Sequence, residues 1–156
     1  MEYSNMEMKP SIEPMKAGDE PAVLALLTAA GLPVEDLGAA DFEHFQVARR
    51  PDGTVVGAVG LEIQGSSGLL RALVMSPDYR GRGLGRRLVE SLEAAAQHRE
   101  IEILYLLTTT APDFFPKLGY HVIPRTEVPP AIAATTEFKS LCPDTAVCLC
   151  RQLSGT

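Results

Sequence analysis

Glycine and arginine alternate in one short segment of the chain, RGRGLG at residues 80–85, which is its clearest candidate for chemistry. Two more arginines follow, Arg86 and Arg87. A strand pattern precedes the segment and a helix pattern starts within it, so backbone N–H groups and a partial positive charge face the loop. Glycine also lets a ligand approach the backbone closely. The segment predicts an anion site suited to a pyrophosphate. The alternative is a glycine-rich turn with solvated arginines.

Two common phosphate sites do not fit this segment. The chain has no G-x-x-x-x-G-K-S/T sequence, which excludes a P-loop nucleotide hydrolase. A Rossmann dinucleotide site needs G-x-G-x-x-G in a tight turn and an acidic residue at the end of the next strand. Here the next strand ends in threonines at 108–110. A nicotinamide-dependent enzyme is therefore not expected.

A glutamate and an arginine in a predicted hairpin form the second candidate. A hairpin that is symmetric about Ser66 and Ser67 places Glu62 directly opposite Arg71, on one face of the sheet. The carboxylate could act as a general base, and the guanidinium could bind a substrate carboxylate as a fork. The alternative is a cross-strand ion pair with no role in catalysis. A bulge in the hairpin would break this register.

Histidine and cysteine give weaker signals. His44 could contact a bound substrate, although a strand histidine is more often a surface residue. Cys148 and Cys150 share a face of the last predicted strand, and Cys142 precedes them. Core cysteines are favoured over a soft-metal site, so no metal is expected.

The elements that must position these residues alternate between strand and helix signals, which predicts an α/β fold. Apolar patterns predict strands at 11–15, 42–49, 54–64, 69–75, 102–108, 120–123 and 146–151. Helical signals cover 19–30 with Asp19 as the N-cap, 83–98, and 112–118 before Gly119, while 129–141 is irregular or weakly helical. We expect a mixed, mostly antiparallel sheet of roughly six or seven strands flanked by about four helices, with a parallel strand pair around the arginine loop.

Composition limits the remaining classes of protein. The 156 residues include 14 basic and 20 acidic side chains, for a formal net charge of -6, and 46% are hydrophobic. This excludes general disorder and argues against a nucleic-acid binder, which would carry a basic face. No apolar run has the length of a membrane span, and three cysteines do not make a disulfide framework, so we expect a cytoplasmic protein. Residues 1–9 are expected to be a disordered arm and residues 10–153 a single domain.

The arginine loop resembles the Q/R-x-x-G-x-G/A acetyl-CoA loop of the GNAT acetyltransferase superfamily. The preceding LVMSP at 73–77 looks like the strand that this family uses against pantetheine. APDFFPKLGY at 111–120 resembles the family's later A-x-x-F-Y/F-x-K-x-G-F/Y segment. Element order and size also agree, so the resemblance covers residues 11–153 and implies the GNAT fold with acetyl-CoA as co-substrate.

A narrower resemblance adds an acceptor class. Two groups share further residues with this chain: the acetyltransferase domain of N-acetylglutamate synthases and the small arsenic-resistance N-acetyltransferases. The shared residues are LLTTTA at 106–111, Phe114, Phe115, Pro129, Ile132, Glu137, Phe138, Cys142, Pro143, Ala146 and Val147. The second group fits a single short chain better, since no kinase-like domain precedes it here. The resemblance implies N-acetylation of an amino acid or an amino-acid analogue, which could contain arsenic or phosphorus.

The resemblance also implies roles for individual residues. Backbone groups of Leu73 and Met75 would hold the thioester carbonyl and pantetheine, amides over 82–86 would hold the pyrophosphate, and three side chains near 115 would flank the CoA arm. The full set of implied CoA-binding residues is Leu73, Val74, Met75, Arg80, Gly81, Arg82, Gly83, Leu84, Gly85, Arg86, Thr109, Phe114, Phe115 and Lys117.

One position departs from the family pattern. Many members have a tyrosine where this chain has Phe115, and the tyrosine hydroxyl protonates the leaving thiolate. Tyr105 is only a weak candidate for this role, so no residue is assigned as the general acid.

We expect direct transfer from acetyl-CoA to a small amine in a ternary complex. Two alternatives remain, a catalytically silent acyl-CoA-binding module and a protein lysine or N-terminal acetyltransferase. The expected partners are a small-molecule amine and, as an open question, a second copy in a homodimer, with neither nucleic acid nor membrane.

Overall fold

The computed structural model describes residues 9–32, 34, 42–109, 111–141 and 146–153. Most of the predicted N-terminal arm, residues 1–8, lies outside this range. The chain divides into two compact units, Met1–Gly60 with Ala72–Leu92 and Leu61–Arg71 with Glu93–Thr156. That residues 10–153 act as one domain stays a prediction.

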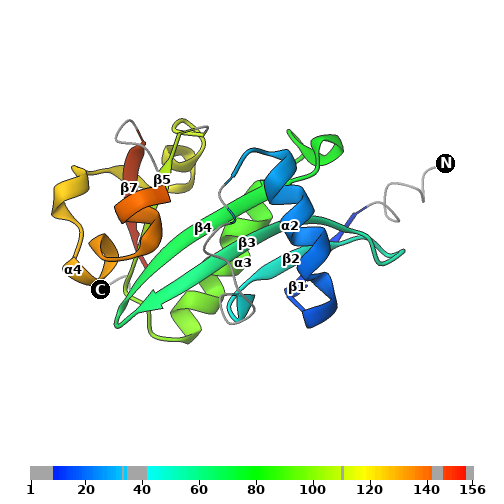
Figure 1. Ribbon diagram of the computed structural model, residues 1–156, viewed down its shortest axis with the longest axis horizontal. Coiled ribbons are helices and arrows are strands. Elements are labelled where there is room, and N and C mark those ends of the chain that lie inside the picture. The colour runs from blue at the N-terminus through cyan, green and yellow to red at the C-terminus, as the bar shows by residue number, and fades with distance from the viewer. Residues whose placement is uncertain (1–8, 33, 35–41, 110, 142–145, 154–156) are drawn as a thin grey trace. The chain divides into compact units, whose positions relative to one another are not determined.

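Seven strands form one sheet in the order β1-β2-β3-β4-β5-β7-β6 (Figure 1). Their bounds are β1 Ser11–Pro14, β2 Gln46–Arg49, β3 Val55–Gln64, β4 Ser67–Met75, β5 Ile103–Thr108, β6 His121–Val122 and β7 Val147–Gln152. β1 with β2, β2 with β3, β5 with β7 and β6 with β7 pair antiparallel. β4 and β5 pair in parallel through Ser67–Leu69 and Ile103–Tyr105. The predicted mixed, mostly antiparallel α/β sheet with its parallel pair is confirmed.

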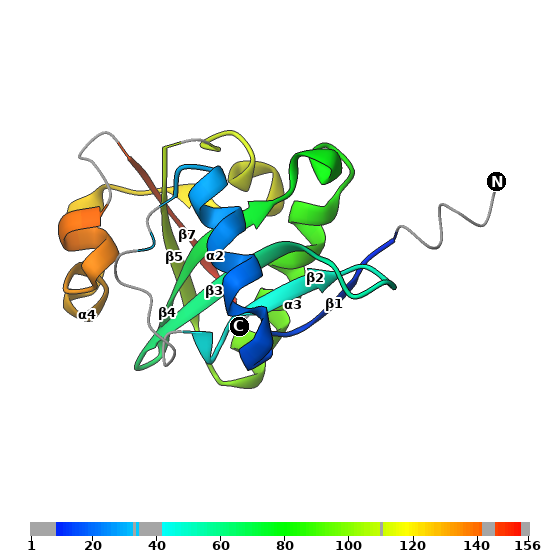
Figure 2. The same ribbon diagram turned by 45° about the vertical axis from the view of Figure 1, so that its right-hand side comes forward.

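In the first unit, helices pack on both faces of the sheet. Val23 and Leu27 of α2 (Glu20–Ala29) join a buried cluster that includes Ala58 of β3. The neighbouring Gly57 faces the other way, because successive strand residues point to opposite faces. A Cβ at Gly57 would lie 3.1 Å from Leu88 of α3 (Leu84–His98). α2 and α3 therefore cover opposite sides of β3, as Figure 2 shows.

In the second unit, one apolar cluster covers a face of β5 and β7. It contains Leu69, Tyr105, Leu107 and Cys148, and the segment after β6 contributes further side chains: Val128, Ile132 and Phe138. That segment includes the short helix α4 (Pro130–Ala133) and a π-helical turn, Glu137–Leu141. Here the sequence predicted only irregular or weakly helical structure.

Three local predictions differ from the structure. The strand predicted over 42–49 is reduced to β2, because residues 42–44 form a turn that Phe45 N–H closes onto Phe42 O at 3.1 Å. The predicted helix over 112–118 is a 3-10 turn, Phe115–Leu118, although Gly119 does end it at a φ of +97°. The hairpin turn is Gly65–Ser66, since β3 ends at Gln64 and β4 begins at Ser67. No helix among the described residues is long and apolar enough to cross a membrane.

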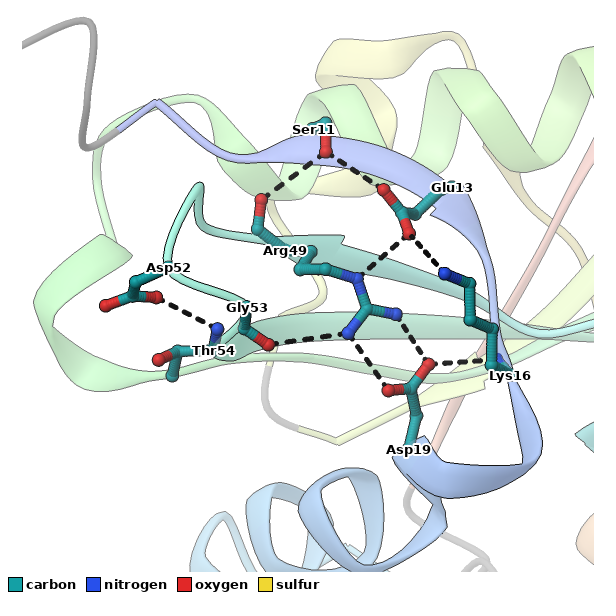
Figure 3. Close-up of polar contacts among 8 residues, drawn as sticks. All are labelled: Ser11, Glu13, Lys16, Asp19, Arg49, Asp52, Gly53 and Thr54. Atoms are coloured by element: carbon teal, nitrogen blue, oxygen red, sulfur yellow. Dashed lines mark hydrogen bonds and ion pairs between the residues drawn. The ribbon is translucent and has the colours of Figure 1, made fainter.

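Asp19 differs from its predicted role and belongs to a cluster of charges at the edge of the sheet (Figure 3). Its carboxylate makes no cap bond to α2 and instead accepts the N–H of Lys16 at 2.9 Å. It also accepts both Nη groups of Arg49, at 3.1 and 2.7 Å, while Arg49 Nε donates to Glu13 at 2.9 Å. Asp19 pairs with Arg49 and does not cap the helix, because charge-assisted bidentate pairs are stronger than most other hydrogen bonds.

Asp19→Asn should lower the free energy of unfolding at pH 7 by about 1 to 3 kcal/mol, because it removes charge-assisted bonds from a buried carboxylate. Hydrogen bonds from Arg49 hold the pKa of Asp19 below its usual 3.8. The contribution is therefore present above the unfolded pKa and is lost as pH falls through the lower folded pKa. Urea titrations from pH 7 downward should show the gap between the two proteins closing below about pH 4. The exposed Asp113→Asn is the charge-matched control; a gap of equal size for both variants at pH 7 would contradict the role of the cluster.

The end of α3 stores conformational strain. The N–H groups of Glu100 and Ile101 return to Gln97 O and Ala96 O, both at 3.0 Å, which is the Schellman arrangement. Glu100 occupies the left-handed position of that motif at a φ of +64°, where glycine is usual.

Glu100→Gly should therefore raise the free energy of unfolding by about 1 kcal/mol, because the left-handed conformation strains a residue that has a Cβ. Glu100→Ala removes the same charge without relieving the strain, so it should give no such gain. Thermal denaturation of the three proteins measures the difference, and equal melting temperatures for the glycine and alanine variants would rule the strain out.

Candidate active site

A β-bulge shapes the strand that precedes the arginine loop. The two-residue turn places Gln64 opposite Ser67, whereas farther along Ser76 N–H donates to Val56 O at 2.8 Å. Between these points β4 has one residue more than β3. The extra residue is accommodated near Ala72, which has a φ of +59°. The bulge sets the direction of the backbone over 73–75. The family resemblance implies that this segment holds the thioester carbonyl and pantetheine of acetyl-CoA.

Side chains of this segment alternate between the core and the surface. Val74 is buried in the cluster with Ala58, so only its backbone is offered to a ligand. Leu73 and Met75 are half-buried. The backbone role expected for this segment is compatible with that arrangement.

The arginine loop presents an open, glycine-lined backbone at the start of α3. Gly81 and Gly83 adopt φ values of +78° and +81°, and a Cβ at either position would have no atom within 4 Å. Leu84 is buried against Gly57 and anchors the helix start, and Arg87 N–H makes the helical bond to Gly83 O at 3.1 Å. The N–H groups of the first turn have no partner within the helix. A phosphate-bearing ligand fits this cradle, because it needs N–H donors and room beside the backbone.

The four arginines of the loop have different surroundings. Arg82 lies over the ring of the buried Tyr79, with 5.8 Å from guanidinium carbon to ring centre. Arg86 Nε pairs with Glu90 at 3.0 Å, and both side chains are largely exposed, so the pair contributes little stability and can give way to a phosphate. Arg87 instead donates to Pro10 O at 2.8 Å and ties α3 to the residue before β1. The exposed arginines are therefore the ones available to an anion: Arg80, Arg82 and Arg86.

The predicted glutamate–arginine pair does form, in the second unit, and it has a third member. Arg71 Nη1 lies 3.6 Å from Glu62, and its Nε lies 4.0 Å from Glu137. The side chains of Arg71 and Glu137 are 7% and 10% exposed, whereas that of Glu62 is 32% exposed. The cluster therefore opens to solvent at Glu62. Glu137 carried no predicted role, because it lies in a segment without periodicity and far from Arg71 in the chain.

The predicted register of the hairpin is wrong, although the pair survives. The turn Gly65–Ser66 puts Leu69 opposite Glu62, with Arg71 two residues farther along β4. Two residues return a side chain to the same face, so Glu62 and Arg71 still meet as diagonal neighbours. His44 lies in the 42–44 turn, half-buried, and not on a strand as predicted.

Phe115 is part of an aromatic core. Its side chain is 3% exposed and makes edge-to-face contacts with Phe114 and Tyr120, with ring centres 5.1 and 5.4 Å apart. Tyr120 donates to Glu93 at 2.8 Å, and Arg151 donates to the same carboxylate at 3.0 Å. Burial raises the pKa of Tyr120, so its proton is retained. Among the other predicted positions of this region, Thr109 and Lys117 are exposed.

Cys148 lies in the core, as predicted, whereas Cys150 is partly buried and packs against the same apolar cluster. Cys148 and Cys150 are free, and burial raises the pKa of Cys148 to about 11. A protonated thiol is a poor metal ligand. Cys142 lies outside the described residues. Across the part of the chain that the structure describes, no group of three or more His, Cys, Asp or Glu side chains could hold a metal ion.

In the first unit, the strand segment 73–75 and the glycine-lined start of α3 are the features of a candidate site for a phosphate-bearing ligand. Residues 41–122 match the acetyltransferase (GNAT) domain. This match covers more than half of the chain, which therefore belongs to the GNAT acetyltransferase family.

Relatives and solved structures agree with this assignment. The chain is 29% identical over 98 residues to an amino-acid acetyltransferase of Azotobacter vinelandii, covering 62% of this chain and 22% of that protein. It is 43% identical over 54 residues to N-alpha-acetyltransferase 80 of Mus musculus, covering 35% of this chain and 17% of that protein. The chain thus spans about a fifth of the length of these relatives.

Two solved structures have the same fold. N-acetylglutamate synthase from Neisseria gonorrhoeae, complexed with coenzyme A and N-acetyl-glutamate, has a TM-score of 0.81 at 22% identity, covering 94% of this chain and 35% of that chain. Rv2747 from Mycobacterium tuberculosis, in complex with CoA, has a TM-score of 0.78 at 22% identity, covering 92% and 99%.

Gly83→Val should abolish CoA binding while the sheet stays folded, because a β-branched residue resists a φ of +81° and fills the open side of the loop. Gly53→Val is the matched control. Gly53 has a φ of +95° and equally open surroundings, but it lies in the turn before β3. Calorimetric titration with CoA measures the effect, and unchanged affinity in a folded Gly83→Val protein would refute the loop assignment.

Proposed function

We propose that this protein is an acetyl-CoA-dependent N-acetyltransferase that acts on the amine of a small amino acid or amino-acid analogue, by direct transfer in a ternary complex. The observation that carries the acceptor class is the cluster at Arg71, where a nearly buried guanidinium stands beside a carboxylate that solvent can reach. An amino acid offers the complementary pair of groups, a carboxylate and an amine. The glycine-lined loop at residues 80–85 supports acetyl-CoA as the acetyl donor.

Glu62 is the proposed base. An alkyl ammonium must lose a proton before its nitrogen can attack a carbonyl carbon, and a carboxylate within reach can take that proton directly or through water. Glu62 is 32% exposed and lies 3.6 Å from Arg71, so an acceptor can reach it while its carboxylate stays oriented. Arg71 would hold the acceptor's carboxylate and so direct the amine toward Glu62.

When bound, acetyl-CoA supplies an acetyl group on a thioester. The new bond joins the acceptor nitrogen to the acetyl carbon, the carbon–sulfur bond breaks, and its electron pair leaves with sulfur. Phe115 has no proton to give that sulfur. A thiol has a pKa near 8.5, so a thiolate is an acceptable leaving group that water can protonate.

Two observations support other functions. The burial of Phe115 among aromatic rings favours a silent acyl-CoA-binding module. The similarity to N-alpha-acetyltransferase 80 favours a protein N-terminus as acceptor. A thiol-release assay separates the three. Wild-type protein should release CoA with free amino acids or their phosphinate or arsinate analogues, whereas release only with peptides, or CoA binding without release, would refute the proposal.

Glu62→Gln should lower turnover more at neutral pH than at high pH, because the free amine is already abundant at high pH and the base matters less. Steady-state rates from pH 7 to pH 10 at saturating acetyl-CoA measure this. If the pair is only structural, the melting temperature falls and the shape of the pH profile persists.

Arg71→Ala is the companion variant. It should raise the KM of the amino acid, leave that of acetyl-CoA nearly unchanged, and erase the preference for an amino acid over its decarboxylated amine. Arg71→Lys retains the charge but not the fork, so it should keep part of that preference. An intact preference in a folded Arg71→Ala protein would remove Arg71 from the acceptor site.

A further inference from the structure

We infer that Arg82 binds the adenine ring of CoA, which stacks on the outer face of its guanidinium. This inference rests on the proposed function, because it takes the glycine-lined loop as the place of the CoA diphosphate. It deepens that function by assigning the adenosine end of the co-substrate to one residue. The observation that carries it is the position of the Arg82 guanidinium over the ring of Tyr79, with 5.8 Å from guanidinium carbon to ring centre.

The backbone of the loop directs Arg82 back over Tyr79. Tyr79 ends the 3-10 turn Pro77–Tyr79. Arg82 stands between Gly81 and Gly83, whose φ values of +78° and +81° are left-handed. Such residues turn the chain sharply, so a side chain three positions after Tyr79 returns toward its ring. The placement of Arg82 is therefore a property of the loop conformation.

One face of the Arg82 guanidinium is covered and the other is open. Tyr79 is 5% exposed, so its ring gives Arg82 a fixed base. Arg82 itself is exposed. Within the part of the chain that the structure describes, no carboxylate pairs with Arg82 and no group hydrogen-bonds to its guanidinium. Because a guanidinium plane stacks well on flat π systems, its outer face is available to a second ring.

The neighbouring arginines suit a different part of the ligand. Arg86 Nε pairs with Glu90 at 3.0 Å, and Arg87 donates to Pro10 O at 2.8 Å. These are contacts from N–H groups to oxygen, the kind that a phosphate also offers. Among the four arginines of the described loop, only Arg82 lies over an aromatic ring. Arg86 therefore suits a phosphate, and Arg82 suits a base.

The chemistry of CoA selects adenine as the group that meets Arg82. The backbone N–H groups expected to hold the diphosphate begin at Arg82 itself. One ribose joins the diphosphate to adenine, and an arginine side chain covers a similar span from its own backbone. Nucleic-acid bases stack on guanidinium planes, whereas the pantetheine arm has no ring that could do so. The base is therefore the part of CoA that this side chain recognises.

Two probes test the contact without acetyl transfer. ADP and ribose 5-diphosphate carry the same diphosphate and differ by the adenine alone. In calorimetric titrations, wild-type protein should bind ADP about five-fold more tightly than ribose 5-diphosphate. Arg82→Lys keeps the charge but lacks the plane, so this preference should disappear while the affinity for ribose 5-diphosphate changes little. Arg86→Lys is the matched control within the loop and should keep the preference.

Two further readouts report on the same contact. The side-chain Nε–H resonance of Arg82, identified by its absence in Arg82→Lys, should shift in the ring current of adenine when ADP is added, and much less with ribose 5-diphosphate. In acetyl transfer, Arg82→Lys should raise the KM of acetyl-CoA about five-fold and leave kcat unchanged, because adenine is remote from the reacting carbon.

The inference and the proposed function fail in different experiments. The inference is overturned if ADP has no advantage over ribose 5-diphosphate in wild type, or if that advantage survives in Arg82→Lys. It is also overturned if Arg82→Lys weakens both probes equally, since Arg82 would then contact phosphate only. Absence of CoA release with every amine overturns the proposed function and leaves the result with the two probes intact.

Discussion

A guanidinium that is 7% exposed must be matched by negative charge, and much of the second unit is arranged around this requirement at Arg71. β4 carries Arg71 into the sheet, β3 brings Glu62 to the same face, and the segment after β6 brings Glu137. That last segment is also held by apolar packing, because α4 and the π-helical turn contribute Ile132 and Phe138 to the apolar cluster of the second unit. The buried guanidinium thus connects three separate pieces of chain.

The donor side depends on backbone conformation more than on side-chain charge. Gly81 and Gly83 adopt left-handed conformations that leave the first turn of α3 open to a ligand. Upstream, Ala72 adopts a left-handed conformation although it has a Cβ, which costs energy and persists because the strands on either side are well paired. The arginines are secondary by comparison, since one of the four, Arg87, is engaged with Pro10.

Sequence patterns correctly predicted the elements that are marked by a short repeat of apolar residues or of glycines. Alternating apolar residues located the strands, helical spacing located α3, and the run of glycines located the loop, because each depends on residues a few positions apart. Glu137 could not be found in this way, since its partner Arg71 is distant in the chain and its own segment has no periodicity. Asp19 has the right residue type for an N-cap, but Arg49 outcompetes the helix for its carboxylate, and local spacing carries no sign of that.

The hairpin Gly65–Ser66 shows how this architecture can change in length. Strand side chains alternate with a period of two, so an insertion or deletion of one residue in β4 between the turn and Arg71 would move Arg71 to the opposite face. A change of two residues would return it to the face that it shares with Glu62. This part of β4 can therefore change in length only in even steps if the pair is kept, unless a second bulge compensates for an odd one.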